Sequence, residues 1–144
     1  MFDGIRAWFK PKPEVLPALP RINDIALLNV ARAVLEAPEP EHFDMTVYGR
    51  DGKPCCALGH YAMRYDLQNI FAGIGTSSET FVNQYFLISR RTGEAISQFD
   101  EDVIDHFGVI PNEMLELFGP CGCNYADTPQ EAAQYIYDFV TRRS

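Results

Sequence analysis

The sequence predicts a helix-rich α+β domain with four to five helices and a small β-hairpin. Apolar residues recur at helical spacing in several segments that begin with a capping residue and end at glycine or proline. One pair of short β-prone segments flanks a glycine-containing turn, as a hairpin requires. The 144 residues are 47% hydrophobic and 22% charged, values typical of a globular chain that can bury a core.

The first 21 residues are expected to form an extended arm ahead of a single globular domain over residues 22–144. Prolines at positions 11, 13, 17 and 20 fix φ and disfavour helix at each preceding residue. Trp8 and Phe9 could dock on the core or on a partner. The basic residues Arg6, Lys10 and Lys12 would suit an anchor on a membrane surface. Such an anchor is not favoured, because the apolar stretch beside them is too short.

The first helix is expected to run to about Glu36 from a cap at Asn23 or Asp24, with a broad apolar face toward the core. Residues 43–48 alternate apolar and polar side chains, which predicts a short strand or an extended segment. The Asp-Gly pair within residues 50–53 then predicts a turn.

A second helix is expected over residues 55–65, opened by Pro54, since proline is favoured in a first helical turn. Residues 66–80 contain two glycines and a Thr-Ser-Ser cluster, which predict a loop. The best hairpin candidate pairs residues 85–89 with residues 95–97.

The last third of the chain is predicted to be helical. Asp100 can cap a short helix over residues 101–107, and a second helix over residues 111–118 starts with proline and ends at glycine. A final helix begins after Thr128, where proline follows and Glu131 is placed to close a capping box.

The net charge of −8 is concentrated in the second half of the chain. Residues 1–72 hold nine acidic and eight basic residues, whereas residues 73–144 hold eleven acidic and four basic ones. Such a field repels nucleic acid and favours a basic protein partner, although carboxylates that only keep a protein soluble would give the same count. The six carboxylates expected to bind that partner are Asp100, Glu101, Asp102, Asp105, Glu113 and Glu116.

The short helices over residues 101–107 and 111–118 also resemble a helix-turn-helix in their spacing. A DNA-reading version needs cations on its second helix, and residues 111–118 contain none, so we expect no nucleic-acid binding. The acidic run before and within the first helix lacks the alternating ligands and central glycine of a calcium loop.

Four cysteines offer an alternative function as a small zinc protein. They form two close pairs, and His60 could supply a further ligand, so the candidate set is Cys55, Cys56, Cys121, Cys123 and His60. Neither pair has the two-residue gap of a zinc knuckle, so no cofactor is our first expectation. Disulfides are not expected, because neighbours this close are poorly placed to bridge within a pair.

The same cysteines offer a second alternative, a cysteine-dependent enzyme. Cys55 or Cys56 at a helix N-terminus would have its thiol pKa lowered by the helix dipole, and His60 follows Cys56 by one turn. A buried cysteine acting as a small apolar side chain is the competing interpretation.

No run of eighteen apolar residues occurs, so no membrane-spanning helix is expected. The N-terminus carries Asp3 and lacks the apolar stretch of a secretory signal, so we expect a cytoplasmic protein.

Four short patterns between about residues 22 and 140 resemble a loosely defined family of small uncharacterised bacterial and phage proteins. In this chain the patterns are Phe43-Asp44-Met45, Cys56-Ala57-Leu58-Gly59, Leu117-Phe118-Gly119, and Thr128-Pro129 with Ala132-Ala133. The family separates its two cysteines, whereas Cys55 and Cys56 are adjacent here. The resemblance implies an architecture and no activity. Together with the charge, it leads us to expect a non-enzymatic binding protein, an accessory factor of a phage or mobile element.

Overall fold

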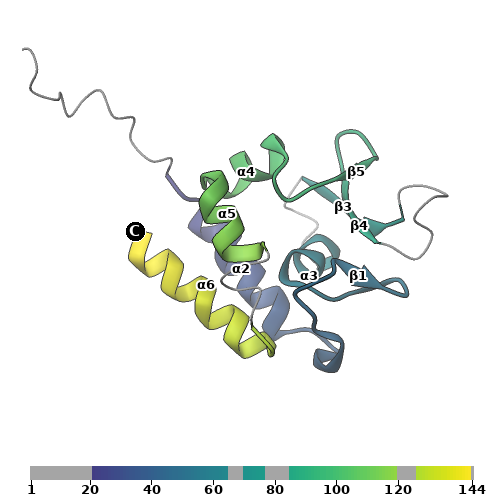
Figure 1. The fold of residues 1–144 in the computed structure, drawn as a ribbon, viewed down its shortest axis with the longest axis horizontal. Coiled ribbons are helices and arrows are strands. Elements are labelled where there is room, and N and C mark those ends of the chain that lie inside the picture. Colours follow the sequence, from purple (N-terminus) through teal and green to yellow (C-terminus); the bar gives the residue numbers. More distant parts are fainter. Residues whose placement is uncertain (1–20, 65–69, 77–84, 120–125, 144) are drawn as a thin grey trace, which may run out of the picture.

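A computed structural model describes residues 21–64, 70–76, 85–119 and 126–143 (Figure 1). Within these ranges the chain forms five α-helices and two small antiparallel sheets, which is the α+β class that the sequence predicts. The expected N-terminal arm lies outside the described residues except for Arg21.

The two longest helices, α2 (Asp24–Leu35) and α6 (Pro129–Arg143), lie side by side (Figure 1). Both begin at the predicted caps. The Asn23 side chain accepts a hydrogen bond from the Ala26 backbone N–H at 3.2 Å. Thr128 Oγ1 accepts from the Glu131 N–H at 3.1 Å, and the Glu131 carboxylate accepts in turn from the N–H of Asp127, one residue before the position of an ideal capping box.

The predicted Asp-Gly turn joins strands β1 (Gly49–Arg50) and β2 (Lys53–Pro54), and both of its central residues have positive φ. No strand forms over residues 43–48, although the carbonyls of Val47 and Tyr48 accept backbone hydrogen bonds from Cys56 and Cys55. A short 3₁₀ helix, η2 (Pro40–His42), precedes that segment, and the Asp44 carboxylate accepts hydrogen bonds from both the N–H and the hydroxyl of Thr46. Such a local turn competes with strand pairing.

Helix α3 spans Ala57–Arg64 and begins two residues later than predicted. Pro54 belongs to strand β2 and not to the helix. The N–H groups of Cys55 and Cys56 donate to the carbonyls of Tyr48 and Val47, so these two residues continue the pairing of the hairpin. The helix therefore starts only where that pairing ends.

A three-stranded antiparallel sheet has the order β3 (Phe71–Gly75), β4 (Phe86–Ser89), β5 (Ala95–Ile96). The hairpin of β4 and β5 is the predicted one. Residues 66–69 and 77–80 of the predicted loop lie outside the described residues, and the prediction was wrong for the part between them, because that part contains β3. Gly73 has a φ of 120° and lies where the register with β4 shifts, so this glycine serves a bulge and does not end a strand.

Helices α4 (Glu101–Phe107) and α5 (Pro111–Phe118) have the predicted boundaries. The Asp100 side chain caps α4 by accepting from the Asp102 N–H at 3.0 Å. Gly108 ends α4 with a φ of 66°, a conformation that favours glycine.

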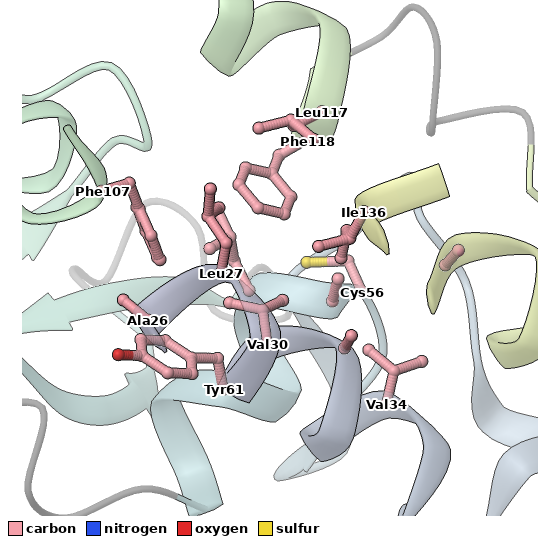
Figure 2. Packing of buried hydrophobic residues seen from close by; sticks show 14 of the residues in the cluster. Ala26, Leu27, Val30, Val34, Cys56, Tyr61, Phe107, Leu117, Phe118 and Ile136 are labelled. Atoms are coloured by element: carbon pink, nitrogen blue, oxygen red, sulfur yellow. The ribbon is translucent and has the colours of Figure 1, made fainter. Parts of the chain in front are cut away.

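The core is one apolar cluster to which all five helices and the three-stranded sheet contribute. Figure 2 shows side chains of α4, α5 and α6 converging on the buried side of α2, around Leu27 and Val30. Phe107 and Ile136 are fully buried there, and burying a side chain of this size is worth about 2 kcal/mol. None of the described helices is long and apolar enough to cross a membrane.

Candidate functional site

The six carboxylates expected to bind a basic partner lie on α4, on α5 and at the residue that caps α4. The fold gives four of them partners within the chain and leaves two without one among the described residues. This division could not be read from the sequence, because it depends on which cations the fold brings to each helix.

On α5, Glu113 is the most constrained of the six. Its carboxylate receives two hydrogen bonds from the Arg143 guanidinium, one of them at 2.8 Å, and a third from the Ile110 N–H at 3.0 Å. The side chains of Glu113 and Arg143 are only 12% and 14% exposed. Burial alone would raise the pKa of Glu113, but the hydrogen bonds from Arg143 and Ile110 outweigh it and hold that pKa below its ordinary value.

Glu116 is also held by the last turn of α6. Its carboxylate accepts from the Arg142 guanidinium at 2.6 Å and from the Tyr135 hydroxyl at 3.1 Å. Both carboxylates of α5 are therefore neutralised by arginines that follow them by more than twenty residues in the chain.

Around α4, two more carboxylates have internal partners. Asp100 caps the helix, and Asp102 accepts two hydrogen bonds from Arg91, at 2.8 and 3.0 Å. Arg91 lies in the turn between β4 and β5, so this ion pair links the three-stranded sheet to α4.

Glu101 and Asp105 differ from the other four. Both are exposed, and they are four residues apart, so they lie on one face of α4. Neither makes an ion pair or a side-chain hydrogen bond with any residue in the described ranges. Phe99, two residues before Glu101, leaves 44% of its surface exposed. We call the exposed side of α4 that carries Glu101 and Asp105 the α4 face; Phe99 precedes the Asp100 cap of this helix.

Two of the four cysteines considered as zinc ligands or nucleophiles lie in the described residues, and two do not. Cys121 and Cys123 lie outside the described ranges. Cys55 and Cys56 are buried free thiols, and Cys56 Sγ accepts a weak hydrogen bond from the Gly59 N–H at 3.4 Å. Burial raises the pKa of both thiols, that of Cys56 to about 12. The expected lowering by the helix dipole was wrong, because removal from water outweighs it.

His60 does not act on the neighbouring sulfur. Its Nδ1–H donates to the backbone carbonyl of Cys56 at 2.9 Å, and the side chain is buried. Burial lowers the pKa of His60, so the ring is neutral near pH 7. The His60 imidazole therefore hydrogen-bonds to the backbone just before α3.

One group with the geometry of metal ligands was missed from the sequence. Glu39, Glu41 and His42 lie in and beside η2, with their ligand atoms within 4.8 Å of one another. The Glu-Pro-Glu-His run that brings them together is visible in the sequence. Lys53 Nζ lies 3.0 Å from Glu39, so a metal ion would compete with an ammonium group for that carboxylate.

A second histidine, His106, lies beside Tyr61 at the edge of the core. His106 Nε2 lies 2.8 Å from the Tyr61 hydroxyl, and burial lowers the pKa of the imidazole. The contact joins α4 to α3 across the edge of the core, and its two residues lie 45 apart in the chain. No local sequence signal marks it.

Searches of protein-family models, of curated proteins and of solved structures gave no match to this chain.

Proposed function

We propose that this protein is a non-enzymatic binding protein that uses the α4 face to engage a basic protein partner. The observation that carries the proposal is the difference among the six carboxylates. Asp102, Glu113 and Glu116 are paired with arginines of the same chain, whereas Glu101 and Asp105 are exposed without a cation among the described residues. The sequence resemblance favours an accessory factor of a phage or mobile element as the biological setting.

The chemistry of the α4 face defines the partner it would suit. Two carboxylates one helical turn apart attract lysine or arginine, and each exposed ion pair contributes about 0.2–1 kcal/mol. Charges of this kind mainly accelerate encounter and select the partner. The exposed Phe99 ring can supply the apolar contact that carries more of the affinity. The expected ligand is therefore a basic segment that also presents an apolar or aromatic side chain.

Charge reversal tests the proposal. The double variant Glu101→Lys, Asp105→Lys should bind a short fluorescein-labelled peptide of lysine and phenylalanine about tenfold more weakly than the wild type, since about 1.4 kcal/mol is lost with the two pairs. Binding by the wild type should also weaken as salt rises. Fluorescence anisotropy measures both effects.

The matched control reverses two exposed carboxylates at the other end of the molecule. Glu41 and Asp127 lie at η2 and just before α6, opposite α4 (Figure 1). The variant Glu41→Lys, Asp127→Lys has the same net charge as the test variant. Equal weakening in both variants would mean that overall charge, and not the α4 face, governs binding, and the proposal would then be wrong.

A further inference from the structure

The N-terminal arm leaves the described domain beside the C-terminal end of α4. The Asn23 N–H donates to the Phe107 carbonyl at 2.9 Å, and the Asn23 side chain donates to the His106 carbonyl at 2.9 Å. A Cβ at Gly108 would lie 2.2 Å from the Arg21 carbonyl oxygen, so the chain passes in direct contact with the end of the helix. Asn23 and Gly108 thus fix where the arm begins.

The α4 face lies within about 10 Å, along the helix axis, of the place where the arm begins. Asp105 and Glu101 precede Gly108 by three and seven residues, which is about 5 and about 10 Å along a helix axis. Lys12 precedes Arg21 by nine residues, which span about 28 Å in the extended conformation that prolines favour. The basic part of the arm can therefore reach both carboxylates with length to spare.

The arm also carries the charge that the α4 face lacks. Residues 4–13 contain three cations and no carboxylate. Most cations of the described residues are already in ion pairs with other carboxylates; the paired ones are Arg32, Arg50, Lys53, Arg64, Arg91, Arg142 and Arg143. The cations of residues 4–13 are Arg6, Lys10 and Lys12, and between Arg6 and Lys10 lie the aromatic residues Trp8 and Phe9.

We infer that residues 5–12 of the arm dock on the α4 face of the same chain in the free protein, where they occupy the site of the basic partner. The arm matches the expected ligand in kind, because it combines cations with aromatic side chains. Its tether removes most of the entropic cost of association, so even a weak contact is populated. This inference rests on the proposed function, since a partner would have to displace the arm to bind.

The chain has a single tryptophan, Trp8, which reports on the arm in the full-length protein. Acrylamide quenching of its fluorescence should be weaker in the wild type than for N-acetyltryptophanamide, in proportion to the docked fraction. The variant Glu101→Lys, Asp105→Lys should restore free quenching, and the control variant Glu41→Lys, Asp127→Lys should leave the protection intact.

Three results would overturn the inference. Quenching of wild-type Trp8 equal to that of the free compound would mean that the arm does not dock. Protection that survives in the Glu101→Lys, Asp105→Lys variant would place the arm elsewhere. Protection that is lost on dilution would mean that a second copy supplies the arm.

Partner binding separates this inference from the proposed function. If the arm occupies the α4 face nine-tenths of the time, the variant Lys10→Glu, Lys12→Glu should bind the lysine-phenylalanine peptide about tenfold more tightly than the wild type. If peptide binding is weakened by Glu101→Lys, Asp105→Lys but is not strengthened in the arm variant, arm docking is refuted and the proposed function stands. Protected Trp8 with no peptide binding to either protein would refute the function and leave the arm contact standing.

Discussion

Alkylation of the native protein at Cys56 tests directly whether this chain can perform thiol chemistry. Burial raises the pKa of Cys56 from an ordinary 9.0 to about 12. At pH 8 the thiolate is then about one molecule in ten thousand instead of about one in ten, since each pH unit is a factor of ten. Because only the thiolate attacks iodoacetamide, Cys56 should react about a thousandfold more slowly than an ordinary thiol. Its 6% exposure slows the reaction further.

The assay follows iodoacetamide incorporation at pH 8 by peptide mass spectrometry, in native buffer and in urea. The variant Cys55→Ser leaves one thiol in that peptide, so the signal belongs to Cys56 alone. In urea the thiol should react at the rate of a free cysteine. In native buffer the reaction should be slower by about three orders of magnitude or should follow the opening of the N-terminal turn of α3.

A native rate for Cys56 within a few-fold of the rate in urea would refute this reasoning. The thiol would then be accessible and ionised, and a cysteine-dependent enzyme would become the better proposal. The expected slow rate would instead identify Cys56 as a small apolar side chain of the core, the role in which Figure 2 shows it near Ile136.

Three further predictions concern stability, each measured by urea unfolding. Gly59→Ala should lower the free energy of unfolding by about 2 kcal/mol, because the new Cβ would lie 2.1 Å from the Tyr48 carbonyl oxygen. The control Gly75→Ala, whose Cβ would have no contact closer than 3.6 Å, should change it by less than about 0.5 kcal/mol. Equal effects of the two substitutions would contradict the packing argument. Arg143→Ala should lower the free energy of unfolding by about 2 kcal/mol, because its side chain is only 14% exposed in the ion pair with Glu113. Arg142→Ala should lower it by less than about 1 kcal/mol, because that side chain is 60% exposed. The reverse order would mean that burial of the ion pair does not set its contribution to stability. Burial lowers the pKa of His60, which is buried, and of His106, which is half-buried, so these two groups should leave stability unchanged between about pH 7 and 8 and lower it as the pH drops below their ordinary pKa of 6.5. The fall should be smaller in His106→Gln, and a rise in stability on acidification would show that the sign is wrong.

The starts of α2, α4 and α6 were predictable because they depend on contacts between residues close in the chain. Asn23, Asp100 and Thr128 each accept a backbone hydrogen bond from two or three residues ahead, so residue type and spacing are sufficient to place a cap. The β4–β5 hairpin was predictable for the same reason, because its two strands are joined by a short turn.

The errors have a different origin. Strand β3 pairs with β4 across residues that lie more than ten positions apart, and Gly73 serves a bulge that only this pairing requires. Pro54 was expected in a helix, but the hydrogen bonds from Cys55 and Cys56 to the chain before the turn extend the hairpin past it. In each case a non-local contact overrode a local preference.

The candidate site shows the same division between sequence and fold. The sequence by itself determined that acidic side chains gather on the two short helices, because residue types and helix boundaries are local properties. Only the tertiary structure decided which of them remain for a partner. Arg142 and Arg143 reach Glu116 and Glu113 across 26 and 30 residues, once the last turn of α6 is brought to α5. Ion pairs form between neighbours in space, so the surface left to the α4 face is a property of the fold.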